Sequence, residues 1–129
     1  MTTLVAVLAV FCGLMIILQI TIAVRSRRLQ KRRIQRLGGP LGEAVASGER
    51  VLAYFYSPSC TESREQTPVI ETLQGEYENI FKVDVGEHFD AARAFGVKTT
   101  PTTIIVEDGK VVEVLIGPRN EERLREALL

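Results

Sequence analysis

The chain opens on a long apolar segment, and shorter apolar patterns recur after it. Residues 4–24, LVAVLAVFCGLMIILQITIAV, hold no charged side chain. At about 1.5 Å per helical residue they match the thickness of a bilayer's hydrocarbon core. A cleaved signal peptide needs a basic start and small residues at its end, but Met-Thr-Thr precedes this segment and arginine follows it. The pattern therefore predicts a retained transmembrane helix.

From residue 41 onward, apolar residues recur at helical spacing or in strand-like runs. The predicted helices cover residues 41–49, 63–77, 87–96 and 120–129, the predicted strands cover 51–57 and 80–85, and a hairpin covers 102–117 with its turn at Asp108–Gly109. The first two strands should be parallel with a right-handed crossover, and the hairpin adds antiparallel strands. The pattern predicts an α/β fold, in which a mixed sheet is flanked by helices and preceded by one transmembrane helix.

Charge divides the chain into three parts. Residues 25–36 hold seven Arg or Lys and no acid, whereas all sixteen Asp and Glu lie from Glu43 onward. We expect a transmembrane helix at 4–24, a basic stalk and hinge at 25–40, and a globular domain at 41–129. The helix should continue through the stalk as far as Gly38-Gly39-Pro40, because Gly and Pro end helices.

The basic stalk predicts both orientation and partners. Positive residues after the span favour a single-pass cell-membrane protein with its C-terminal domain in the cytoplasm, where thiols stay reduced. The run lacks interleaved aromatic residues and adjoins the span, so we expect residues 4–36 to contact membrane lipid, and we expect no nucleic acid partner. Two cysteines and one histidine give no metal-ligand spacing, so we predict no metal and no cofactor.

Cys60 is the candidate reactive group. It stands between a predicted strand and a predicted helix, where the positive end of the helix dipole favours a thiolate. Three residues later, where a second thiol would close a Cys-x-x-Cys pair, stands Ser63. Its hydroxyl can hydrogen-bond the Cys60 sulfur, whereas the charge of Glu62 should oppose the thiolate. The alternative is that Cys60 is an inert, half-buried residue.

Several motifs occur together in one order. Residues 41–129 contain, in this order, Cys-x-x-Ser with Pro68, FKVDV, GVKTTPT with Pro101, EDGKVV and Gly117. In this combination the chain resembles the thioredoxin family. The resemblance implies the thioredoxin fold, catalytic positions at Cys60 and Ser63, and a cis-proline at Pro101 against the cysteine. It also implies a groove at Thr100, Pro101 and Gly117 that binds an extended peptide.

The chain departs from the family pattern at the chemical positions. The second cysteine falls on Ser63, and the buried acid of the preceding strand falls on Tyr54. Ser59 replaces the tryptophan before the cysteine, and the first strand of the family fold is missing. Lys82 matches the family's strand lysine.

Two functional hypotheses follow, and the departures favour the first. The domain could be an interaction module or accessory subunit of a larger membrane complex, binding a protein partner. The alternative is a membrane-tethered monothiol thiol–disulfide oxidoreductase that uses Cys60, and whether the protein is an enzyme stays open.

Overall fold

The computed structural model describes residues 1–35 and 37–129, with side chains at 1–29 and 37–129. The chain divides into two units, Met1–Gln30 and Lys31–Leu129. Apart from Met1, the first unit lies within α1 (Thr2–Gln35), which continues from the apolar segment into the basic stretch, as expected. Within the described residues one helix is long and apolar enough to cross a membrane, at Thr2–Leu29.

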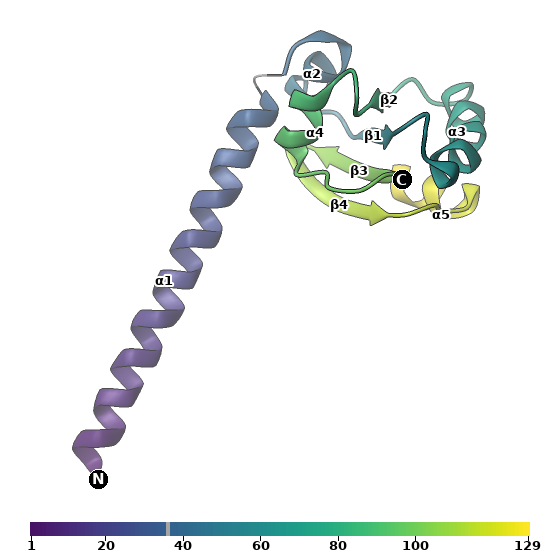
Figure 1. The fold of residues 1–129 in the computed structure, drawn as a ribbon. Helices are drawn as coiled ribbons and strands as arrows, with labels where there is room; N and C mark the ends of the chain where they lie inside the picture. Colours follow the sequence, from purple (N-terminus) through teal and green to yellow (C-terminus); the bar gives the residue numbers. More distant parts are fainter. Residues whose placement is uncertain (36) are drawn as a thin grey trace. The chain divides into compact units, whose positions relative to one another are not determined.

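The globular unit contains helices and strands in the predicted order. Its helices are α2 (Gly39–Ala46), α3 (Thr61–Gln74), α4 (Phe89–Phe95) and α5 (Glu121–Leu128), and its strands are β1 (Val51–Tyr56), β2 (Ile80–Asp84), β3 (Thr102–Glu107) and β4 (Lys110–Ile116). In this part of the chain the strands form a four-stranded sheet in the order β2-β1-β3-β4 (Figure 1). β1 is parallel to β2, and antiparallel pairs join β1 to β3 and β3 to β4. The predicted mixed sheet with flanking helices is confirmed.

β1 lies inside the sheet, and its side chains alternate between two cores. Val51, Ala53 and Phe55 pack in one core with residues of α2 and α4. Leu52 and Tyr54 pack in the other with residues of α3 and α5. Because both faces are covered, the strand is apolar along its length. Each large apolar side chain buried here stabilises the fold by about 1.5–3 kcal/mol.

α2 begins two residues before the predicted helix. Gly38 is its N-cap and Pro40 lies in its first turn, where the fixed φ of proline suits a helix and its missing N–H costs nothing. Gly42 is buried against the carbonyl of Leu37, and a Cβ at this position would clash with that carbonyl. Gly39 and Pro40, expected as part of a hinge, thus belong to α2, while the boundary between stalk and domain stays a prediction.

The hairpin and the last helix follow their local sequence signals. Asp108 and Gly109 both have positive φ, 53° and 70°, which is the conformation of a two-residue hairpin turn. The side chain of Asn120 accepts a hydrogen bond from the backbone N–H of Arg123 at 2.9 Å and caps α5. The turn at Asp108–Gly109 was predicted from the sequence.

Candidate active site

Cys60 lies at the N-cap of α3, directly after the loop that follows β1. Its backbone N–H donates to the Ser57 carbonyl at 3.1 Å, and its own carbonyl accepts from the Arg64 N–H at 3.1 Å. This turn aims the side chain at the loop before β3, where the thiol donates to the Thr100 carbonyl at 3.6 Å. Cys60 remains partly exposed, so a reactant can reach the sulfur.

Hydrogen bonds lower the pKa of the Cys60 thiol. The largest cause is the Ser63 hydroxyl, followed by the Ser63 backbone N–H and then by Thr100. Partial burial opposes these effects and raises the pKa. Glu62 was expected to oppose the thiolate, but its backbone N–H also lowers the pKa, and its carboxylate is exposed. The net effect favours the thiolate, which is the nucleophilic form.

Ser63 is buried beneath Cys60 in the first turn of α3. Its hydroxyl accepts a hydrogen bond from the Ser57 backbone N–H at 3.3 Å. Its carbonyl accepts from the Tyr54 hydroxyl at 2.9 Å and from the Thr67 hydroxyl at 2.7 Å. Ser63 therefore ties the loop before Cys60 to α3, in addition to its effect on the sulfur.

Tyr54 occupies the position where the resemblance implied a buried acid. The side chain is fully buried, and its hydroxyl bonds Ser63 and lies 3.1 Å from the Thr67 hydroxyl. Burial is the largest influence on the pKa of Tyr54 and raises it, so the side chain stays neutral near pH 7. Lys82, on the neighbouring strand, forms an ion pair with Glu71 at 2.9 Å.

Thr100, Pro101 and Gly117 lie on two loops that are joined to each other, and Thr100 contacts Cys60. The Thr100–Pro101 peptide bond is cis, and Gly117 has a φ of 85°. The Gly117 N–H donates to the Pro101 carbonyl at 2.9 Å, which joins the loop after β4 to the loop before β3. The structure thus places Thr100 against Cys60 and joins Pro101 to Gly117. The predicted groove for an extended peptide stays a prediction.

Gln66 was not predicted from the sequence. It is buried one turn after Ser63, on the face of α3 that also carries Ile70. Its Oε1 accepts from the Arg119 backbone N–H, so it holds α3 against the loop that follows Gly117. Its Nε2 has no hydrogen-bond partner among the described residues. Its position at helical spacing from Ile70 was the signal that could have identified it.

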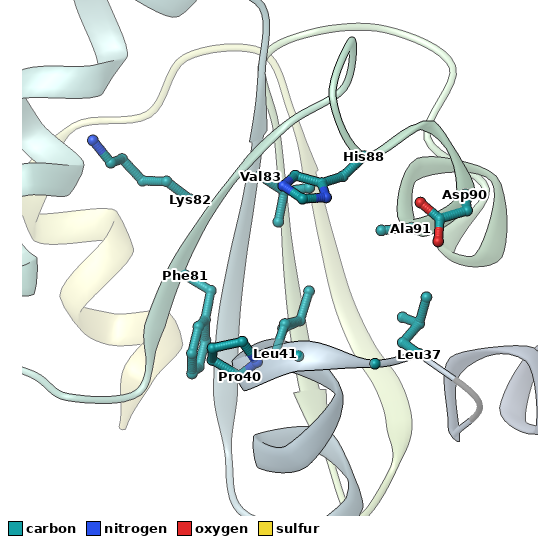
Figure 2. A pocket seen from close by; sticks show the side chains of 11 residues that line it. Leu37, Pro40, Leu41, Phe81, Lys82, Val83, His88, Asp90 and Ala91 are labelled. Carbon is teal, nitrogen blue, oxygen red and sulfur yellow. The ribbon is translucent and has the colours of Figure 1, made fainter.

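A separate pocket of about 230 Å³ lies between the start of α2, β2 and the start of α4. Figure 2 shows Pro40 and Phe81 on one side of this hollow and His88 and Asp90 on the other. None of the predicted site residues lines it. Within residues 1–35 and 37–129 the structure brings together no group of three or more His, Cys, Asp or Glu side chains that could hold a metal ion.

A helix that begins at Cys60 on this mixed sheet defines a thioredoxin-like domain. Residues 41–129 match the family model for thioredoxin. Thioredoxin of Listeria monocytogenes serovar 1/2a is 41% identical over 89 residues, which cover 67% of this chain and 86% of that relative. Thioredoxin of Bacillus subtilis strain 168 is 38% identical over 79 residues, which cover 59% and 76%. The chain belongs to the thioredoxin family.

Solved structures agree with this assignment. A mutant thioredoxin from Halobacterium salinarum NRC-1 matches with a TM-score of 0.61 and 32% identity, covering 67% of this chain and 77% of that chain. Fasciola hepatica thioredoxin matches with a TM-score of 0.61 and 30% identity, covering 68% and 88%. The apolar helix at Thr2–Leu29 lies outside the matched family segment.

Proposed function

We propose that this protein is a membrane-tethered monothiol redox module, which forms mixed disulfides with protein partners through Cys60. One observation carries the proposal: a partly exposed cysteine whose thiol pKa is lowered by hydrogen bonds from Ser63. The similarity to proteins named thioredoxin favours redox chemistry at this position. The apolar helix would hold the module at a cytoplasm-facing membrane surface.

The reaction begins with attack by the Cys60 thiolate on one sulfur of a partner's disulfide. A bond forms between the two sulfurs, the partner's own disulfide bond breaks, and its second sulfur leaves as a thiolate that takes a proton from water. Ser63 cannot attack the mixed disulfide, because a hydroxyl does not take part in thiol exchange. A low-molecular-weight thiol must therefore attack the partner's sulfur and release the Cys60 thiolate. A second such thiol then frees the partner as a thiol, and the two small thiols leave joined as a disulfide.

A second candidate function is a redox-silent interaction module within a membrane complex. It is favoured by Ser63 and Tyr54, which supply neither a second thiol nor a buried carboxylate; the Tyr54 hydroxyl instead donates to the Ser63 carbonyl. In this case the groove at Thr100, Pro101 and Gly117 would bind an extended segment of a partner without exchange. The partner would be a subunit of the same membrane complex.

Capture of partners separates the two functions. Cells that express the wild type or Cys60→Ala are treated with a thiol-alkylating reagent before lysis, and the protein is purified in mild detergent with and without reductant. We expect an adduct that depends on Cys60 and disappears on reduction. Cys60→Ser serves as a near-isosteric control and should also lose the adduct. The interaction module would be established instead if partners co-purify equally with the wild type and with both variants, survive reductant, and form no adduct.

Ser63→Cys should convert the single-thiol site into one that completes its own cycle. The new thiol lies one helical turn from Cys60 and can attack the mixed disulfide. We expect adducts to become scarcer and disulfide-reductase turnover to rise modestly, since Tyr54 supplies no acid. Turnover is measured with insulin as substrate, and Ser59→Cys, placed outside the helix, serves as the matched control. Unchanged adduct levels in Ser63→Cys would contradict the prediction.

A further inference from the structure

Two arginines beside Cys60 carry charge that no carboxylate of the described residues neutralises. The chain after residue 36 holds sixteen Asp and Glu against nine Lys and Arg. Four of these nine form ion pairs: Arg50, Lys82, Arg123 and Arg125. Arg64 and Arg119 belong to the other five, so their charge is available to an acceptor from outside the domain.

Arg64 reaches back from α3 to the loop in front of Cys60. Its backbone N–H donates to the Cys60 carbonyl at 3.1 Å, and its Nε donates to the Pro58 carbonyl at 3.0 Å. The residue is exposed. The Pro58 contact fixes the guanidinium beside the loop and leaves its two terminal nitrogens as donors for a ligand.

Arg119 is fixed through both its backbone and its side chain. Its backbone N–H donates to Oε1 of the buried Gln66 on α3. Its Nη1 donates to the Pro118 carbonyl at 2.9 Å and lies 3.8 Å from the point where a Cβ on Gly117 would stand. The Gly117 N–H in turn donates to the Pro101 carbonyl. The second guanidinium therefore lies over the loop after β4, and Gln66 holds it there.

The strand order places the two arginines on either side of the thiol. β1, β3 and β4 are neighbours and run antiparallel, so the loops after β1, before β3 and after β4 meet at one end of the sheet. Arg64 contacts the first loop, the Cys60 thiol contacts the second at Thr100, and Arg119 belongs to the third. Neighbouring strands lie about 4.8 Å apart, so the first and third loops are about 10 Å apart, the length of about three extended residues.

We propose that the partner segment that reacts with Cys60 is acidic, with Asp or Glu within about three residues of its cysteine on each side. A guanidinium with free N–H groups bonds a carboxylate through strong, directed hydrogen bonds. Complementary charge across an interface speeds encounter and fixes register. This inference rests on the proposed monothiol function and names the class of substrate for it.

Two acids on α3 restrict where the partner's carboxylates can lie. Glu62 and Glu65 are exposed near the start of this helix, and like charges across an interface are disfavoured. The partner's acids should therefore lie to the two sides, over Pro58 and Gly117, and not over the first turn of α3. At physiological salt the Debye length is about 8 Å, so the adjacent arginines outweigh the more distant acids of the domain.

Activated peptides test the preference. The full chain with Cys12→Ser, in nanodiscs of neutral lipid, is mixed with peptides whose single cysteine is disulfide-bonded to pyridine-2-thiol. The Cys60 thiolate attacks the peptide sulfur, a new disulfide forms, and pyridine-2-thione leaves and is followed by its absorbance. Three peptides differ only in carrying Glu, Gln or Lys at the second and third positions on each side of the cysteine. We expect the Glu peptide to react about three- to ten-fold faster than the Gln peptide, and the Lys peptide to react slowest.

Arg64→Gln and Arg119→Gln should each lower the ratio of the Glu-peptide rate to the Gln-peptide rate about two- to five-fold. Added salt should lower the same ratio in the wild type. Lys110→Gln is the matched control, because it removes one exposed, unpaired charge at the hairpin end of β4, about 20 Å from Ile116. It should leave the ratio unchanged, and circular dichroism checks that all three variants keep their fold.

The outcomes separate this inference from the proposed function. If no peptide forms a disulfide with Cys60, the proposed function fails and the inference fails with it. Three results would overturn the inference alone, with thiol exchange intact. These are equal rates for the Glu and Gln peptides, a preference that both arginine variants retain, and a preference that Lys110→Gln loses equally, which would trace it to net charge.

Discussion

At the scale of single residues, Ser63 and Tyr54 place hydroxyl groups near Cys60. They stand at the positions where the family pattern has a second thiol and a buried carboxylate. Ser63 supplies hydrogen bonds that favour the thiolate, and Tyr54 bonds the Ser63 carbonyl from the buried side. A hydroxyl stabilises a neighbouring thiolate without changing charge itself near pH 7. In the proposed function, this site would form a mixed disulfide but could not resolve it, because no second thiol lies at position 63.

Removing the Ser63 hydroxyl should raise the pKa of Cys60, since that hydroxyl is the largest cause of its lowered value. In Ser63→Ala less thiolate is present at pH 7, and alkylation by iodoacetamide should be slower there than in the wild type. The rate is measured against pH on a fragment from Leu37 onward, which keeps the residues that pack against the core. Glu62→Gln serves as the control and should change the profile little. Equal midpoints for Ser63→Ala and the wild type would contradict this account.

Replacing Tyr54 by Phe should lower stability at neutral pH but flatten its loss in alkali. Tyr54→Phe removes a buried hydroxyl with two partners, which should cost about 0.5–1.5 kcal/mol of unfolding free energy. Because burial raises the Tyr54 pKa above 10.0, the folded state retains a proton that the unfolded state releases. Stability should therefore be present below about pH 10 and fall above it.

Urea unfolding of the same fragment between pH 7 and pH 11 measures both effects. Tyr77→Phe is the matched control, because Tyr77 is only partly buried. The prediction is wrong if the unfolding free energy of Tyr54→Phe falls as steeply above pH 10 as that of the wild type.

The sequence predicted some of these residues because their positions follow a pattern. Cys60 follows a strand and starts a helix, and Pro101 precedes a strand that could not hold proline in its interior. Gln66 was missed because a glutamine on a helix is usually exposed. Its burial depends on the Arg119 N–H, a contact 53 positions away in the chain that no local pattern contains.

At the scale of elements, order and type could be predicted, whereas edges and ends could not. Helical and strand-like periodicity specified each element, and the Asp108–Gly109 turn specified the hairpin. α2 starts earlier than predicted because Pro40 fits its first turn and Leu37 packs against the core. Which strands lie at the edges of the sheet depends on the pairing order, and the structure places β2 and β4 there.

The Asn120 cap gives a prediction for α5, whose buried face packs against α3 in one core. Asn120→Ala removes the acceptor for the Arg123 N–H and should lower the unfolding free energy by about 1 kcal/mol. Urea unfolding of the fragment from Leu37 onward measures the loss. Asn120→Asp keeps an acceptor at the same place and should restore most of the stability. A loss in Asn120→Asp as large as in Asn120→Ala would show that capping is not the cause.

At the scale of the whole molecule, the chain combines an apolar helix, a basic stretch and an acidic domain. The domain has sixteen acidic residues against nine basic ones after residue 36, a net charge of about minus seven. If the apolar helix spans a membrane, anionic lipid headgroups would attract the basic stretch and repel the acidic domain. In the proposed membrane-tethered module, this charge pattern would keep the domain in solution, where Cys60 could react with partners.

The domain should face the cytoplasm, because seven basic residues follow the span and positively charged flanks stay inside. In cells expressing the Cys12→Ser variant, a membrane-impermeant maleimide should label Cys60 only after the membrane is permeabilised. Thr2→Cys, in a background without Cys12 and Cys60, is the matched control and should be labelled in intact cells. Replacing the seven basic residues at 25–36 by glutamine should remove the bias and expose part of the Cys60 population. Labelling of Cys60 in intact cells that express the unaltered stalk would contradict the predicted orientation. It would place the thiol outside, in an oxidising compartment.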